Sequence, residues 1–205
     1  MSEHNPTEEQ IDQSNDVDAA TVEITRNYLV SAAEEMKESL IRTAYNSVIY
    51  SIWDFGISLY DADLNLVADS PGLTIFLGAN DFAIKKGVEY VGRDNFNPGD
   101  VVMMNYPYWS SSHTFDAMLF SPIFRDPDVG EDLIGFAACR GHLVDMGQME
   151  GAYQIDTMDI HQEGLKFPGQ KIWKEGEADE EILDIIRFNN RSPDLTMGDI
   201  HAQVA

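Results

Sequence analysis

Basic residues are scarce in this chain of 205 residues, which has 13 lysines and arginines against 36 aspartates and glutamates. The formal net charge is therefore −23, and this sign repels the phosphates of nucleic acids and of anionic membranes. The acids are spread along most of the chain and do not form one block. Dispersed charge favours a salt-rich cytosol over an acidic interaction surface, because salt screens the repulsion. We therefore predict a halophilic source and infer no function from the charge.

Cysteine and long apolar runs are also nearly missing. Cys139 is the single cysteine, so an internal disulfide framework is excluded, and its apolar neighbours predict a buried thiol rather than a nucleophile. No apolar run reaches the roughly 18 residues that a membrane span needs. The polar, acidic N-terminus lacks the basic and apolar regions of a secretory signal, so the expected location is the cytoplasm.

Phosphate-binding loops are a further absence. Neither the Walker A pattern nor the glycine pattern of dinucleotide-binding folds occurs, so we expect no nucleotide site on this chain. The nucleophile elbow of the α/β-hydrolases is missing too.

The hydropathy pattern predicts an α+β fold with a mixed or antiparallel sheet and flanking helices. Residues 1–18 are acidic and poor in large apolar side chains, which predicts a disordered leader before one domain at 19–205. An apolar stripe from Val22 to Ala44 predicts a long amphipathic helix, and two alternating runs around the turn 61–63 predict a β-hairpin. Further segments complete the prediction: helices at 79–92, 178–189 and from 194, and strands at 101–104, 117–124 and 133–139. In the helix at 178–189 we expect Ile182, Ile185 and Ile186 to point inward.

Two His-x-x-Asp pairs are the first candidates for chemistry: His113 with Asp116, and His142 with Asp145. Residues three apart on a strand face opposite sides, so each pair can converge only where the backbone bends. Imidazole and carboxylate together suit a divalent ion such as Zn, Mn or Fe. The alternative interpretation is that these side chains cap turns by hydrogen bonds and hold no metal.

Three charged residues are candidates for catalysis. Glu163 can serve as a ligand, as a general base or as a solvated loop carboxylate, and Asp145 is the other candidate carboxylate. Arg140 is expected at a strand end, where it can bind a substrate carboxylate bidentately or pair with a nearby acid. The sequence leaves open which carboxylate acts as the base.

Four stretches together resemble the N-terminal part of the hydantoinase B/oxoprolinase family. They lie at 26–45, 54–63 (DFGISLYDAD), 98–116 (PGDV, NYPY, then His113 and Asp116) and 162–166 (QEGLK), and their order and spacing match from about residue 20 onward. The family includes subunits of ATP-dependent oxoprolinases, N-methylhydantoinases and acetone or acetophenone carboxylases. In carboxylase-like members a His-x-x-Asp and a later His hold a divalent metal, and His113, Asp116 and His142 fall on those positions. Here Leu143 follows His142, where the family commonly has a second histidine.

The resemblance implies a chain that is incomplete relative to the family and works with partners. The expected partner is a hydantoinase A-type subunit that binds ATP, and the missing C-terminal portion can be a separate chain. The function implied first is ATP-dependent ring opening of 5-oxoproline or a hydantoin, because phosphorylating a lactam oxygen creates a better electrophile. One alternative is a carboxylase subunit, in which a metal stabilises an enolate. The other is a truncated remnant that only binds partner chains.

Overall fold

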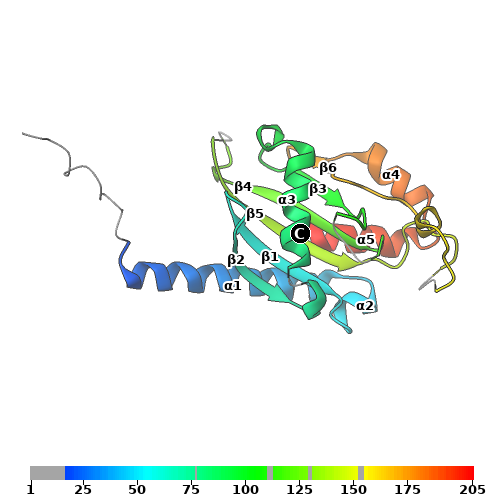
Figure 1. Cartoon of the computed structure of the whole chain (residues 1–205), viewed down its shortest axis with the longest axis horizontal. Helices are drawn as coiled ribbons and strands as arrows, with labels where there is room; N and C mark the ends of the chain where they lie inside the picture. The colour runs from blue at the N-terminus through cyan, green and yellow to red at the C-terminus, as the bar shows by residue number, and fades with distance from the viewer. Residues whose placement is uncertain (1–16, 77, 110–112, 129–130, 152–154) are drawn as a thin grey trace, which may run out of the picture.

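An antiparallel sheet of seven strands organises the chain, in the order β2-β1-β5-β4-β3-β6-β7 (Figure 1). The computed structural model describes residues 17–76, 78–109, 113–128, 131–151 and 155–205. The strands are β1 Phe55–Asp61, β2 Leu66–Pro71, β3 Val101–Met104, β4 Asp116–Asp126, β5 Glu131–His142, β6 Gln170–Lys174 and β7 Glu177–Ala178. The predicted α+β class is confirmed, and of the two predicted sheet types the antiparallel one is present.

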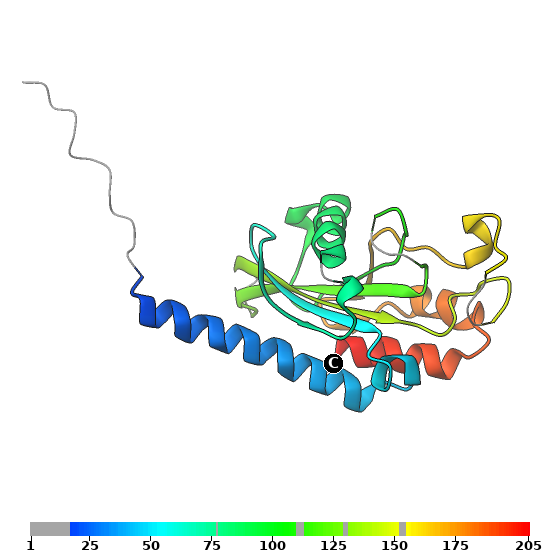
Figure 2. The same ribbon diagram turned by 60° about the horizontal axis from the view of Figure 1, so that its bottom comes forward.

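Helices cover both faces of the sheet. The α-helices are α1 Ala19–Thr43, α2 Ser47–Tyr50, α3 Ala79–Val91, α4 Glu180–Phe188 and α5 Pro193–Val204. Short 3-10 turns occur at η1 Thr74–Phe76, η2 Arg93–Asn95 and η3 Ile160–Glu163. Figure 2 shows α3 on one face, with α1 and α5 on the other. No helix in the described part of the chain has both the length and the apolar character needed to cross a bilayer.

The long hairpin of β4 and β5 forms the centre of the sheet and divides the core into two layers. Side chains that alternate along a strand point to opposite faces. Met118 and Phe120 therefore pack with the residues under α3, whereas Ala117 and Leu119 pack with the residues of α4 and α5. This alternation also decides which polar residues of β4 and β5 can meet.

The predicted N-terminal helix is present, but only part of its apolar stripe is buried. Asp18 caps α1 by accepting hydrogen bonds from the N–H groups of Ala20 and Thr21. Val22 is 53% exposed, and buried residues of the helix begin at Ala33. The N-terminal half of α1 extends past the edge of the sheet, so periodicity alone overestimated its burial (Figure 1). Most of the predicted leader, residues 1–16, lies outside the described residues.

Three further details of the fold differ from expectation. In α4 the buried residues are Leu183 and Ile186, while Ile185 is 50% exposed, so the predicted inward face was rotated. Strands β6 and β7 were not predicted, because the run Gln170–Lys174 mixes polar and apolar residues in too short a segment. The helix α2 was also missed, since four residues give no readable period.

Candidate functional site

Three neighbouring strands bring their polar end residues together on the side of the sheet that faces α3. Asp116 is the first residue of β4, and it lies directly opposite His142, the last residue of β5. Asp54 precedes β1, whose first residue Phe55 pairs with Gly141 of β5. The N–H of His142 donates to the carbonyl oxygen of Asp54 at 3.0 Å, which fixes this junction. The site is thus built by strand register.

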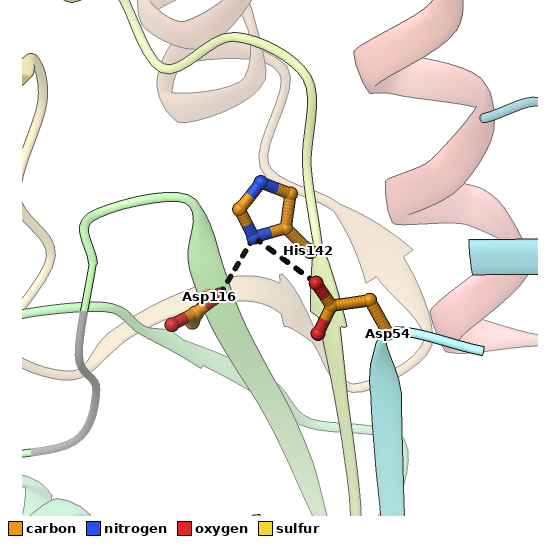
Figure 3. Close-up of side chains that lie close together, drawn as sticks. All are labelled: Asp54, Asp116 and His142. Atoms are coloured by element: carbon orange, nitrogen blue, oxygen red, sulfur yellow. Dashed lines mark hydrogen bonds and ion pairs between the residues drawn. The ribbon is translucent and has the colours of Figure 1, made fainter. Parts of the chain in front are cut away.

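The two carboxylates point toward one ring nitrogen of His142 (Figure 3). His142 Nδ1 lies 2.9 Å from Asp116 Oδ1 and 3.8 Å from Asp54 Oδ2. Asp116 is 1% exposed and His142 is 6% exposed, whereas Asp54 is half-buried. An imidazole and two carboxylates therefore share a small space that is largely shielded from solvent.

His113 lies beside this group. Its backbone N–H donates to Asp116 Oδ2 at 3.1 Å, so the predicted His-x-x-Asp does bend back on itself. The rings of His113 and His142 are 5.9 Å apart between centroids and stand nearly perpendicular. The structure thus places His113, Asp116 and His142, the residues that the family resemblance implies as metal ligands, close together, with Asp54 beside them.

The segment that carries His113 is anchored to two other parts of the chain. The hydroxyl of Thr114 donates to the carbonyl oxygen of Glu163 in η3. The side-chain amide of Asn105, just after β3, donates to the carbonyl oxygens of Thr114 at 2.6 Å and Leu165 at 3.0 Å. These bonds hold the start of β4 in place and so position Asp116.

The electrostatics of the site favour a shared cation. Burial is the main cause that raises the pKa of Asp54, and the nearby Asp116 carboxylate raises it further. The imidazoles of His142 and His113 act in the opposite direction and lower this pKa. Two carboxylates in one half-buried space repel each other when both are ionised, and a positive charge between them offsets that repulsion.

The donor geometry also fits a divalent ion. Single ligand atoms from Asp54, Asp116 and His142 all lie within 4.8 Å of one another. Nitrogen and oxygen ligands bind Zn at about 2.0–2.2 Å, so neighbouring ligand atoms around one ion stand about 3–4 Å apart. One imidazole with two carboxylates is the donor set of a borderline or hard ion, including Zn, Mn and Fe. The residues present therefore fit the metal that the family resemblance implies.

Asp54 is the member of the site that the sequence patterns did not indicate. It has no His-x-x-Asp spacing, and it reaches the others only because β1 pairs with β5. The signal that the sequence offered was the position of Asp54 directly before an apolar strand, because an acidic residue in that position lies at the end of the strand.

Asp145, a predicted catalytic residue, has a different set of partners. Its Oδ2 accepts a hydrogen bond from the backbone N–H of Arg191 at 2.6 Å, and its Oδ1 accepts one from Gly147 at 2.8 Å. The guanidinium of Arg191 lies 3.4 Å from the same carboxylate. Asp145 thus ties the loop after β5 to the start of α5, although it also lines a cavity next to the site.

Glu163, the other predicted catalytic carboxylate, lies in η3. Its Oε1 accepts a hydrogen bond from the hydroxyl of Thr157 at 3.2 Å, while its backbone carbonyl holds Thr114. Through Thr114 it is linked to the His113 segment, but its carboxylate does not belong to the Asp54–Asp116–His142 group.

Arg140 requires a correction, because it does not lie at an open strand end. It is inside β5, opposite Met118, and is 0% exposed. Its guanidinium lies over the ring of Phe76 at 5.5 Å, and neither Nε nor Nη1 reaches an acceptor in the described residues. Burial lowers its pKa to about 10, and the charges of Asp116 and Tyr60 oppose this shift. The expected contact with a substrate carboxylate is not available to a side chain in this position.

The neighbouring residue Cys139 agrees with its prediction. It is buried, and burial raises the pKa of its thiol to about 12. A thiol with this pKa remains protonated at neutral pH and is a poor nucleophile.

A cavity of about 550 Å³ opens beside the site. Asp54 and His142 form part of its wall, together with Phe115 from the segment before β4. The remaining lining residues come from α2, the loop after β5 and the start of α5: Val48, Ile52, Val144, Asp145, Gly151, Arg191, Ser192 and Leu195. A molecule in this cavity would lie against the carboxylate–imidazole group.

Comparison with known proteins gives one consistent result. The family model described as hydantoinase B/oxoprolinase matches residues 18–205. The chain is 32% identical to a putative D-/L-hydantoinase B-type subunit of Pseudomonas sp., covering 92% of this chain and 32% of that protein. It is 31% identical to the beta subunit of the caprolactamase of Pseudomonas jessenii, covering 92% of this chain and 32% of that protein. It is 29% identical to the 5-oxoprolinase of Dictyostelium discoideum, covering 93% of this chain and 15% of that protein.

Solved structures agree with this result. The ATP-dependent caprolactamase from Pseudomonas jessenii superposes with a TM-score of 0.83 at 30% identity, over 91% of this chain and 32% of that chain. The nucleotide-free acetone carboxylase has a TM-score of 0.76 at 18% identity, over 90% of this chain and 24% of that chain, and so shares the fold. The chain spans about a third of the length of the caprolactamase and hydantoinase subunits that it matches.

Proposed function

This chain belongs to the hydantoinase B/oxoprolinase family, and we propose that it is part of an ATP-dependent amidohydrolase that opens 5-oxoproline or a hydantoin. The observation that carries the proposal is the meeting of Asp54, His113, Asp116 and His142 beside an open cavity. Relatives named as a hydantoinase subunit, a 5-oxoprolinase and an ATP-dependent caprolactamase support the reaction class.

ATP is used on a partner in this proposal. The sequence has no phosphate-binding loop, and a hydantoinase A-type subunit is the proposed site of phosphoryl transfer. A lactam resists hydrolysis because its nitrogen donates electrons into the carbonyl group. Phosphorylation of the carbonyl oxygen withdraws those electrons, so that water can attack the same carbon.

The present chain receives the activated ring in its cavity. Asp116, His142 and Asp54, with His113 at their side, are the residues that would hold a divalent ion. Such an ion supplies Lewis-acid polarisation and lowers the pKa of bound water. Asp116 orients the His142 ring through the 2.9 Å contact at Nδ1, and the buried setting of these residues excludes bulk solvent.

The pKa of Asp54 suits it to proton transfer. Burial raises this pKa above the usual carboxyl value, and a raised pKa makes the ionised carboxylate a stronger base. Asp54 also lines the cavity, so it can contact a substrate molecule or an attacking water there. We therefore add Asp54 to Asp145 and Glu163 as a candidate general base.

The test combines purified chain, purified hydantoinase A-type partner and ATP. We expect phosphate release that depends on 5-oxoproline or a hydantoin, together with the ring-opened product. Turnover that requires bicarbonate and a ketone would assign the chain to the carboxylase branch instead. If neither substrate class gives turnover and the complex contains no metal, the chain only binds partners.

A substitution at His113 tests metal binding at the site. His113→Ala should abolish metal retention, and elemental analysis of the purified complex measures this directly. His161→Ala is a matched control, because His161 is an exposed histidine of η3 outside the group. Full metal occupancy in His113→Ala would remove His113 from the ligand set and leave Asp54 as the third donor.

A further inference from the structure

The cavity beside the site is lined mainly by hydrocarbon. Val48 and Ile52 line one part of it from α2 and the residues after it, and Val144 follows β5. Leu195 of α5 and Phe115 complete the apolar lining. Ile52 is 60% exposed and Leu195 is 39% exposed, so both present apolar surface where a bound molecule can cover it. Covering such surface releases about 25 cal/mol per Å².

The lining offers an anionic ligand no unpaired arginine or lysine among the described residues. Arg191 is the only arginine or lysine in that lining, and its charge is balanced by Asp145 at 3.4 Å. Its Nη2 also donates to the carbonyl oxygens of Gln148 at 2.6 Å and Met149 at 3.0 Å. Nη1 and Nη2 of this half-exposed guanidinium are therefore already paired within the protein.

The other charged groups at the wall are two carboxylates and the imidazole of His142 that lies against them. Asp54 lines the cavity, and Asp116 lies just behind it against His142. A divalent ion would at most neutralise these two carboxylates. A ligand carboxylate would therefore be repelled by Asp54 and Asp116, or, with an ion bound, would face a group of zero net charge. It would also find no unpaired guanidinium or ammonium group among the described lining residues.

We propose that this cavity selects an uncharged cyclic amide with a hydrocarbon ring, and that Ile52 and Leu195 are specificity-determining residues. This inference rests on the proposed function and narrows it: of the two substrate classes in that proposal, the uncharged hydantoin type fits the cavity and 5-oxoproline does not. The amide group would face Asp54 and His142, and the ring would cover Val48, Ile52 and Leu195.

The experiment measures binding and needs no turnover. The two probes are 2-pyrrolidinone and 5-oxoproline, which have the same lactam ring and differ by one carboxylate. Each is titrated into the full 205-residue chain without ATP, and the dissociation constant is measured by NMR chemical-shift perturbation. We expect 2-pyrrolidinone to bind at least about tenfold more tightly, a difference of about 1.4 kcal/mol.

A positive charge placed in the wall should weaken this preference. Leu195→Lys adds a cation inside the cavity and should lower the preference for 2-pyrrolidinone at least about fivefold, which is about 1 kcal/mol. Ile52→Lys tests the same idea from another lining residue, should the α5 variant fail to fold. Ile185→Lys is the matched control, because Ile185 is a half-exposed residue of α4 outside the lining, and the preference should stay unchanged.

Two results would overturn the inference. One is tighter or equal binding of 5-oxoproline by the unaltered chain, and the other is no measurable binding of either probe. Failure of the proposed function has a different signature, because the binding preference would persist while no ring opening occurs with ATP and the partner. Conversely, efficient ring opening of 5-oxoproline would support the function and reject the selectivity.

Discussion

Asp116 and His142 face each other across the central hairpin, with Asp116 Oδ1 only 2.9 Å from His142 Nδ1. They are the first residue of β4 and the last residue of β5, so the whole length of the hairpin lies between them in sequence. The strand register that pairs Met118 with Arg140 also sets this contact. A one-residue slip would turn one of the two side chains to the opposite face.

Asp116→Asn tests this contact as part of a metal site. The substitution keeps the shape of the side chain but removes a negative charge from the donor set. We expect metal affinity to fall by at least about tenfold, as measured by equilibrium dialysis followed by elemental analysis. Asp126→Asn, at the exposed far end of β4, is the control and should retain the metal. Equal affinities in the two variants would show that Asp116 serves only to orient His142.

Asp54→Asn tests, through the pH dependence of stability, how far the ionised Asp54 carboxylate destabilises the fold. Because burial raises the folded-state pKa of Asp54, its protonated form stabilises the fold below the unfolded pKa of about 3.9. This contribution is lost as the pH rises through the raised folded-state pKa. In the presence of a chelator we therefore expect Asp54→Asn to be more stable than the unaltered chain at pH 7.

The measurement for Asp54 is urea unfolding at several pH values. The two proteins should converge as the pH falls below about 4, where the carboxyl group is protonated in both states. Added Mn or Zn should reverse the order at pH 7, since only the aspartate supplies a charged ligand. Asp63→Asn, in the exposed turn after β1, should show neither effect.

Arg140→Met tests whether the buried guanidinium serves the fold. The charge is 0% exposed, and two of its nitrogens lack acceptors in the described residues, which is a costly arrangement. Replacing it with an apolar side chain of similar length should leave the free energy of unfolding unchanged or raise it by about 1–3 kcal/mol. Arg125→Met, on the exposed end of β4, should change stability by less than about 0.5 kcal/mol.

The activity of Arg140→Met then decides its role. If the variant is stable but no longer binds metal or turns over substrate, Arg140 supports the site through the effect of its charge on Asp116. A clear loss of stability would instead mean that the guanidinium has partners that compensate its burial.

Asp145→Ala tests the structural role assigned to that carboxylate. The change removes the acceptor for the backbone N–H groups of Gly147 and Arg191 and leaves the Arg191 charge unbalanced. We expect a loss of about 2–4 kcal/mol in the free energy of unfolding, measured by urea titration. Asp145→Asn keeps an acceptor oxygen and should lose less. A variant that keeps normal stability but has no activity would favour Asp145 as the general base.

Local patterns were sufficient to predict most elements of this fold. Helices α1 and α3 and the strands β1, β3, β4 and β5 were found close to their observed bounds, because their apolar residues recur at the right period. The same patterns could not show that the first half of α1 extends beyond the sheet, since periodicity reports which residues are apolar and not what covers them. They also missed β6, which pairs with β3, and β7, which pairs with β6, because both pairings depend on the rest of the sheet.

The sequence by itself determined the acidic charge, the buried thiol and the α+β class, and its family resemblance implied His113, Asp116 and His142 as site residues. Only the tertiary structure decided that Asp54 joins them, that Arg140 is enclosed with its guanidinium over the Phe76 ring, and that Asp145 binds Arg191. The physical reason is that strand pairing brings together residues from distant parts of the chain. No spacing along the sequence encodes which strand lies next to which.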